Sequence, residues 1–381
     1  MKAVIEQIKE LYWNHGLITI FTIFNLIPTI TALNIEVSYY SYRGSLFYAI
    51  IYYLIGVSLT IIGYIPKAPH KRELNLIRVK RVFFIASLLL VSIGLLVAYK
   101  TLTEITDIST LQNMLMEGEE VDKLKAEISY GGLAGIFKMF ACMPLCIFLI
   151  SSSIYFFSQY DKHSTRAIKL IMIISFIALI IKTFIYFDRI TLLAALLVFI
   201  HHFFYNKNLT KTVKIVIISA IIIMAVFVTA LRMADVGFVE FLGLYFNLGV
   251  VNLEVLIEKQ DAFNYDFSQT FLNPMGYIFK FLSLPYTSIG PKDFIWNDAQ
   301  SYWGFLYIDF NWIGLFFMPL FGRAIRIVES YKQKTAFCMC FYFIFMYCLF
   351  SFFTIPIIRS IEFWLMILTT LFLSKYGLKK I

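Results

Sequence analysis

The chain has 381 residues, of which 60% are hydrophobic and only 15% charged, and its formal net charge is +9. The apolar share of a soluble globular domain is roughly one half, so this composition excludes a soluble domain and indicates an integral membrane protein. The spanning elements are expected to be helices, because lipid offers no partners for unpaired backbone groups and the alternating segments of a membrane barrel are absent.

Apolar runs of about 17 to 21 residues recur along the chain, which is the length of a helix that crosses a hydrocarbon core of about 30 Å. The weakest of the predicted spans are the fifth and sixth, separated only by Asp188 and Arg189, and the eighth, which carries Asp309. The sequence thus predicts an all-α polytopic protein with one membrane domain over 1–381. The ten predicted spans are 17–35, 45–65, 82–99, 135–157, 170–187, 190–205, 215–231, 303–322, 336–353 and 360–374.

Lys and Arg in the short loops orient the predicted spans. Segment 66–81 holds six basic residues and one acid, and is therefore expected on the cytoplasmic side. Alternation from this segment places both termini in the cytoplasm. The basic residues are dispersed over several loops, which indicates membrane orientation and argues against a nucleic-acid partner. The first apolar run lacks a cleavage site behind it and is expected to be an ordinary span.

Two long loops are predicted on the external side, 100–134 and 232–302. The first is rich in acids and is expected to form a solvated helical hairpin or lid. The second is predicted to contain interfacial helices, because a narrow stripe of polar side chains runs along an otherwise apolar helix there. Such a helix would lie in the membrane interface, or pack against the bundle with its stripe facing a wet cavity. The stripe consists of Glu240, Asn247, Glu254, Glu258 and Asp261.

Three arginines, Arg189, Arg232 and Arg359, lie at the outer ends of predicted spans, where orientation rules leave few basic residues. Lys182 precedes Arg189 by seven residues, a spacing that places both on one helical face if the helix is continuous. Snorkelling to the headgroups or ion pairs with neighbouring acids are alternative explanations. Guanidinium groups bind phosphates through paired hydrogen bonds. A lipid with a diphosphate headgroup would place its phosphates at the depth of these arginines, so it is a candidate substrate.

Three stretches carry a resemblance to a known family. FDRITLLAALLVFI at 187–200 places Asp-Arg before an apolar span, and Arg232 is followed after ten residues by Gly243. Segment 297–325 contains an aromatic-Gly pair, then Tyr-x-Asp-Phe, then two glycines, with Asn311 where the family usually has glycine. These stretches resemble the bacterial oligosaccharide repeat-unit polymerases, the O-antigen and capsule polymerases.

The resemblance implies a membrane glycosyltransferase of lipopolysaccharide or capsule biosynthesis in the bacterial inner membrane, with its site facing the periplasm or exterior. A sugar hydroxyl of the incoming unit attacks the anomeric carbon of the growing glycan, and undecaprenyl diphosphate leaves. Cations at the diphosphate stabilise the charge that develops on it. Arg232 and Arg189 are assigned this catalytic role, and Arg359 and Lys182 are assigned to substrate binding.

The attacking hydroxyl needs a carboxylate base within hydrogen-bond reach. The candidates are Asp235 and Asp309 as catalytic residues, and Asp188 and Glu254, which are also assigned to substrate binding; the sequence does not choose among the four. Aromatic side chains are predicted to stack on sugars, and Trp296, Tyr302 and Trp303 are the candidates in the second loop.

The loop acids lack a metal-ligand pattern such as Asp-x-Asp, so neither a metal nor a cofactor is expected. The expected partners are an undecaprenyl-diphosphate-linked oligosaccharide and membrane lipid, and the resemblance adds a flippase and a chain-length regulator. Two other functions stay open. A transporter or flippase of the same lipid would use membrane charges such as Lys138 and Lys182. An O-antigen ligase-like transferase is less favoured, because the outer loops contain no histidine.

Overall fold

The structure is a computed structural model in which the chain is mostly helical. Its contacts divide the chain into two units, which are described separately. Unit 1 comprises Met1–Pro69, Val236–Ser330 and Phe345–Phe363, and unit 2 comprises His70–Asp235, Tyr331–Ile344 and Trp364–Ile381. The residues that the structure describes are 2–34, 45–65, 76–105, 139–157, 159–160, 162–186, 189–205, 219, 223, 238–259, 301–352 and 357–380.

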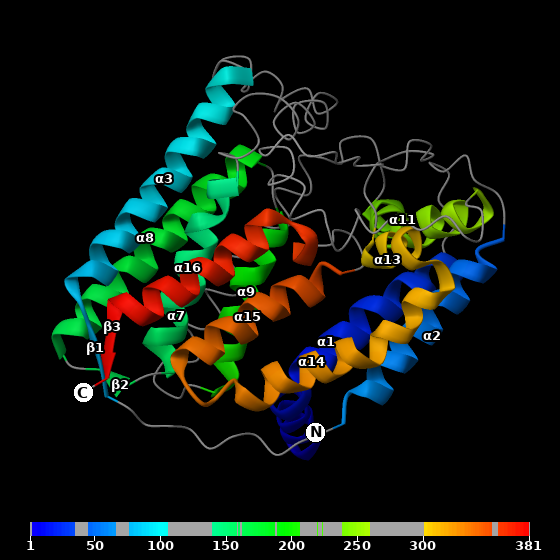
Figure 1. Ribbon diagram of the computed structural model, residues 1–381, viewed down its shortest axis with the longest axis horizontal. Coiled ribbons are helices and arrows are strands. Elements are labelled where there is room, and N and C mark those ends of the chain that lie inside the picture. The colour runs from blue at the N-terminus through cyan, green and yellow to red at the C-terminus, as the bar shows by residue number, and fades with distance from the viewer. Residues whose placement is uncertain are drawn as a thin grey trace. The chain divides into compact units, whose positions relative to one another are not determined.

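Unit 1 is built from long helices and two short 3-10 segments (Figure 1). Its elements are α1 (Lys2–Asn34), α2 (Phe47–Gly63), α11 (Phe238–Lys259), α13 (Tyr302–Phe310), the 3-10 helices η2 (Asn311–Phe317) and η3 (Ile357–Arg359), and nearly all of α14 (Met318–Tyr331). Helices α15 (Ala336–Phe350) and α16 (Ile361–Gly377) each contribute residues to both units.

Unit 2 combines helices with a small three-stranded sheet. Its elements are β1 (Leu76–Val79), α3 (Arg81–Ile105), η1 (Met139–Cys142), α7 (Met143–Phe157), β2 (Gln159–Tyr160), α8 (Lys162–Tyr186), α9 (Arg189–Tyr205) and β3 (Leu378–Lys380). Strand β1 pairs parallel to β2 and antiparallel to β3. The sequence analysis did not predict this sheet, because strands of two to four residues are too short to show an alternating pattern.

The described helices are consistent with an all-α membrane protein, to which the small sheet is an addition. Among the described residues, five helical stretches are long and apolar enough to cross a membrane, and three more are apolar but shorter. Nine of the ten predicted spans fall on described helices, whereas the span at 215–231 lies outside the described residues except for Ser219 and Ile223. The first long loop, 100–134, is described only to residue 105. The five candidate spans are Asn14–Leu33, Arg81–Thr103, Met139–Phe156, Ser164–Tyr186 and Tyr302–Tyr331.

A buried tryptophan organises the core of unit 1. Trp303 is 0% exposed, and its Nε1 donates a 2.7 Å hydrogen bond to Oδ1 of Asn25 on α1. Its ring lies 5.4 Å from the rings of Tyr53 and Phe352. A Cβ atom at Gly56 would overlap the Trp303 ring, so the helix surface at this position must be bare backbone. Trp303 thus fixes α13 against both α1 and α2.

Replacing Gly56 with valine is expected to destabilise the protein by about 2 kcal/mol or more, because the added methyl groups must displace a close-packed indole. Ser58→Val is the matched control, since Ser58 is exposed on the same helix and receives the same side chain. Thermal unfolding of the purified protein in detergent measures both. Equal melting temperatures for the two variants would contradict this packing.

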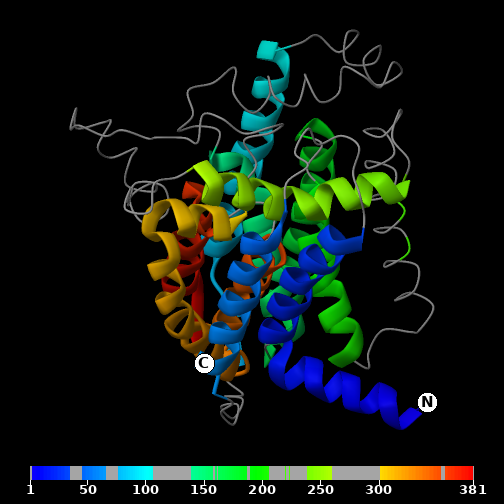
Figure 2. The same cartoon turned by 90° about the vertical axis from the view of Figure 1, so that its right-hand side faces the viewer.

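A second polar cluster joins α1, α2 and α14. Helix α1 bends at His15, whose backbone is not helical (φ −136°, ψ 32°), and Figure 2 shows its N-terminal part turned away from the rest. The bend releases amide groups from the helix ladder. Leu17 N donates to Oε1 of Glu329 at 3.2 Å, and Tyr64 Oη donates to Oε2 at 3.1 Å. His15 Nδ1 lies 2.9 Å from the same hydroxyl, so one buried carboxylate connects three helices.

In unit 2, α7 is the central helix. It packs against α3, α8 and α9, and its residues from Met143 to Ile150 are buried. The rings of Phe148, Phe176 and Phe199 lie 5.4 to 5.6 Å apart and join α7, α8 and α9. Helices α3 and α8 run side by side with the small sheet at one end (Figure 1). That end is closed by the Ser164 hydroxyl, whose Oγ accepts a 3.1 Å hydrogen bond from Val79 N.

Candidate functional site

Helices that contain parts of two of the three stretches that carry the family resemblance pack on one another in unit 1. Helix α11, which begins six residues after Arg232 and contains Gly243, lies across the ends of α1 and α2 and contacts α13 (Figures 1 and 2). Gly243 is buried there. Helix α13 carries the Tyr-x-Asp-Phe sequence at 307–310. A helix is therefore present where the polar stripe predicted one, and it packs against α1, α2 and α13.

The polar stripe of α11 faces the other helices of unit 1. Asn247 and Glu254 are 3% and 1% exposed, whereas Glu258 is exposed. The side chain of Glu240 and the whole of Asp261 lie outside the described residues. Because α11 contacts α1, α2 and α13, the buried side chains of Asn247 and Glu254 meet packed helices. The expectation of a wet cavity along it stays a prediction.

Glu254 has a structural role at the start of α2. Its Oε2 accepts a 2.5 Å hydrogen bond from Ala49 N, and Tyr48 N also interacts with this carboxylate. These amides belong to the first turn of α2, where backbone donors lack partners within the helix and a negative charge is stabilised. Burial raises the pKa of Glu254, and the two backbone amides oppose this shift.

Replacement of Glu254 with alanine is expected to lower the stability by about 1 to 2 kcal/mol at pH 4, where the carboxyl is protonated, because the amide of Ala49 loses its acceptor in a buried place. Glu254→Gln keeps an acceptor without a charge. The raised pKa means that the folded state holds the proton at higher pH than the unfolded state, whose pKa is about 4.5. The stability that the protonated carboxyl contributes is therefore complete below pH 4.5 and is lost as pH rises through the folded pKa.

Thermal unfolding from pH 4 to pH 8 tests this assignment. Wild type should lose stability relative to Glu254→Gln as pH rises through this range. A difference that is constant, or that grows in favour of wild type with rising pH, would contradict the stated direction.

Asp309 lies immediately before a break in a membrane helix. Helix α13 ends at Phe310, and the 3-10 helix η2 leads into α14, so the candidate span Tyr302–Tyr331 is discontinuous. Asp309 is 0% exposed and lies close enough to Tyr302 to interact with it electrostatically. A carboxylate buried within a membrane segment is costly and commonly marks a functional site.

The break is made by Asn311, which has a positive φ of 52°. Its ψ of −145° lies outside the αL region that asparagine tolerates, and glycine adopts such a backbone most readily. The backbone there suits the glycine of the family that the chain resembles, and it is strained with asparagine in this place. Tyr52 on α2 donates a 3.1 Å hydrogen bond to the Asn311 carbonyl, which satisfies one backbone group freed by the break.

Two of the three aromatic residues assigned to sugar stacking are described, and they differ in accessibility. Tyr302 is partly exposed, and its ring lies over those of Phe321 and Phe352. Trp303 is completely buried, and its packing against Asn25 and Gly56 accounts for it as a core residue. We therefore correct the set by removing Trp303. Tyr302 stays a candidate, and Trp296 lies outside the described residues.

In unit 2, Lys182 approaches the start of α9. It is 8% exposed, its Nζ donates a 3.4 Å hydrogen bond to Oγ1 of Thr191, and it lies 5.6 Å from the centre of the Tyr186 ring. Arg189 is the first residue of α9. The two cationic residues thus belong to two helices, and the argument from one continuous helical face does not apply. The contact between α8 and the first turn of α9, and not a shared helical face, brings Lys182 near the start of α9.

The other predicted site residues lie at or beyond the limits of the description. Arg232, Asp235 and Asp188 are outside the described residues. Arg359 belongs to η3, and for it, as for Arg189, only the backbone is described. Within the described ranges, no three His, Cys, Asp or Glu residues are grouped closely enough to hold a metal ion.

Sequence reasoning overlooked several polar residues of unit 1. Asn25, Tyr52 and Glu329 each make a hydrogen bond that connects two helices. A sequence signal was available for Asn25, because it is a single polar side chain within an apolar run. Burying such a side chain in a membrane is costly unless it has a hydrogen-bond partner.

Comparisons with family models, curated proteins and solved structures found no match to this chain.

Proposed function

We propose that the chain is a membrane glycosyltransferase that polymerises lipid-linked oligosaccharide repeat units at the outer face of the bacterial inner membrane. The observation that carries the proposal is the packing of α11 on α13, because the helix that contains Gly243 contacts the helix that carries the Tyr-x-Asp-Phe segment, although the two are far apart in the sequence. The positive φ of Asn311 supports it further, since the backbone there suits the family's usual glycine.

The proposed topology has ten spans, with both termini in the cytoplasm and one membrane domain over the whole chain. The five long apolar helices support the coarse form of this arrangement. Outer ends would then include the start of α2, the start of α13 and the helix α11 that lies across them. This is the side on which a periplasmic lipid-linked glycan would be presented.

Asp309 is the proposed general base. Its carboxylate accepts the proton of the acceptor sugar hydroxyl while that oxygen bonds to the anomeric carbon of the growing glycan. The bond from the anomeric carbon to the diphosphate oxygen breaks, and undecaprenyl diphosphate leaves with both electrons. Its developing charge would be stabilised by Arg232 and Arg189, with Arg359 and Lys182 holding the substrate.

Asp309 is favoured over Glu254 because it belongs to the Tyr-x-Asp-Phe segment of the resemblance and lies beside the break after α13. Asp235 stays a catalytic candidate, and Asp188 stays a candidate for substrate contacts. Neither a metal nor a cofactor enters the proposed reaction, because the diphosphate linkage supplies its free energy. A flippase that delivers the units and a regulator of chain length are the proposed protein partners.

A transporter of the same lipid is the second candidate, and one observation favours it. Discontinuous membrane helices next to buried charges are common at transporter substrate sites, and the break between α13 and α14 beside Asp309 has this form.

The glycan of a strain lacking the protein separates the two functions. Loss of the polymerase leaves single repeat units on the cell surface and removes the ladder of longer chains. Accumulation of lipid-linked units on the cytoplasmic side would instead identify the protein as a flippase.

A further inference from the structure

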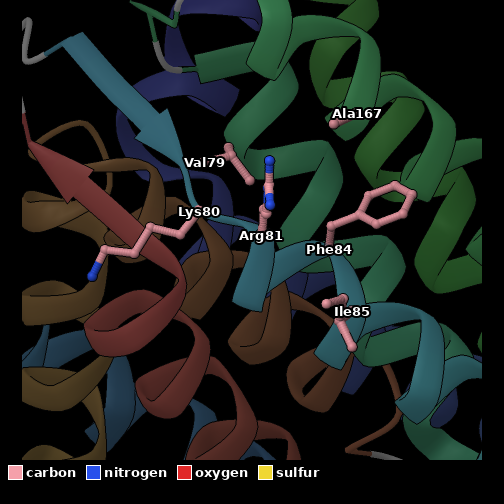
Figure 3. Close-up of a pocket in the computed structure, with 6 residues that line it drawn as sticks. All are labelled: Val79, Lys80, Arg81, Phe84, Ile85 and Ala167. Atoms are coloured by element: carbon pink, nitrogen blue, oxygen red, sulfur yellow. The ribbon is translucent and has the colours of Figure 1, made fainter.

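A pocket of about 390 Å³ opens in unit 2 where α3 and α8 begin. Figure 3 shows the Arg81 side chain rising from the first turn of α3, with Phe84 and Ile85 further along the same helix and Ala167 on the neighbouring α8. Lys80 also lines the pocket, and its side chain extends away from Arg81. Its six lining residues are Val79, Lys80, Arg81, Phe84, Ile85 and Ala167.

The pocket lies where the candidate membrane spans of α3 and α8 begin. The candidate spans of α3 and α8 begin at Arg81 and Ser164, and the hydrogen bond from Val79 N to Ser164 Oγ holds these two starting points together. A lipid phosphate lies at this depth in a bilayer, because the headgroups adjoin the first turn of a spanning helix.

The charge around the pocket is strongly positive. The stretches 76–85, 164–170 and 378–380, which meet in the sheet and the adjoining helix starts, contain seven basic residues and no acid. Arg81, Arg166 and Lys169 are all exposed. A single-sign field of this kind attracts an anionic headgroup.

The pocket adjoins an exposed apolar surface. Ile85, which lines the pocket, is 56% exposed, and Leu170 on α8, which does not line it, is 48% exposed. Phe84, one turn after Arg81 on α3, also lines the pocket. A soluble anion would gain nothing from such a surface, whereas an acyl chain would cover it.

We propose that this pocket binds one anionic phospholipid, with its phosphate on the Arg81 guanidinium and an acyl chain along Phe84 and Ile85. The bound lipid connects the ends of α3 and α8 to the inner-side membrane surface. Arginine suits this role because its planar group forms paired hydrogen bonds with phosphate. The inference is independent of the proposed polymerase activity, because it concerns a different part of the chain and needs no glycan.

Native mass spectrometry of the purified full-length protein in detergent measures the binding directly. Phosphatidylglycerol is expected to bind about 10-fold more tightly than phosphatidylcholine, and Arg81→Gln is expected to remove this preference. Arg323→Gln is the matched control, because it removes one exposed arginine from α14 and should keep the preference. Equal retention of phosphatidylglycerol by Arg81→Gln would overturn the proposal.

A second variant separates the pocket from the general positive charge. Ala167→Phe keeps every basic residue and fills part of the cavity, so it should weaken phosphatidylglycerol binding as well. Unchanged binding in this variant would show that surface charge alone attracts the lipid, and would refute the site. Inorganic phosphate at equal concentration should not displace phosphatidylglycerol, and displacement would identify a soluble-anion site instead.

Discussion

Loss of long polysaccharide chains is the expected result when Arg232 or Arg189 is replaced with alanine. Each arginine is proposed to stabilise the diphosphate as it leaves, and removal of one such group commonly lowers a rate by about 100-fold to 1000-fold. The glycan ladder on a gel should collapse to single repeat units, while those units still reach the cell surface. Lysine at either position should restore only part of the activity, because an ammonium group cannot form the paired contact.

Arg323→Ala is the matched control for these variants. Arg323 is exposed on α14 in unit 1 and has no proposed contact with the substrate, so its ladder should resemble that of wild type. Protein amounts in the membrane must be equal for the comparison. Full-length ladders from both Arg232→Ala and Arg189→Ala would exclude these arginines from the reaction.

Asp309→Asn is expected to reduce polymerisation by about 100-fold to 10,000-fold, the range that a general base contributes. Asparagine has nearly the same size as aspartate, so the buried packing around Asp309 should persist. The variant should therefore unfold at a temperature close to that of wild type while its rate of polymerisation falls. Rate and stability must be measured on the same preparation.

Glu329→Gln provides the contrast, because Glu329 is another buried carboxylate in the same candidate span. Its oxygens accept hydrogen bonds from Leu17 N and the Tyr64 hydroxyl, so its loss should lower the melting temperature. Polymerisation per folded molecule should be retained. A normal ladder for Asp309→Asn, or equal losses of activity in the two variants, would show that Asp309 is not the base.

Much of the helical architecture was predictable because hydrophobic run length is a strong signal in membrane proteins. The starts of α3 and α9 differ from the predicted limits by one residue, and α11 was expected from a polar stripe spaced by helical turns. The discontinuity after Asp309 was harder to anticipate, since an apolar run reads the same whether its helix is continuous or broken. The family that the chain resembles usually has a glycine at this position, and its replacement by Asn311 left the local turn in doubt, although the backbone there has a positive φ.

The candidate site was less predictable, since long-range packing decides which polar groups are accessible. Composition does not distinguish a tryptophan that stacks on sugar from one that fills a core, and Trp303 proved to be the latter. The capping role of Glu254 depends on the start of α2, about 200 residues earlier in the chain. Likewise, one helix ends and the next begins between Lys182 and Arg189, so their spacing in the sequence does not place them on one helical face.

Reconstitution of the purified protein with its substrate tests the central claim most directly. The protein is placed in liposomes with a radiolabelled undecaprenyl-diphosphate-linked oligosaccharide, and the products are separated by length. We predict products of two or more repeat units together with released undecaprenyl diphosphate, and neither with Asp309→Asn. Transfer of intact single units across the bilayer, without any longer product, would contradict the account.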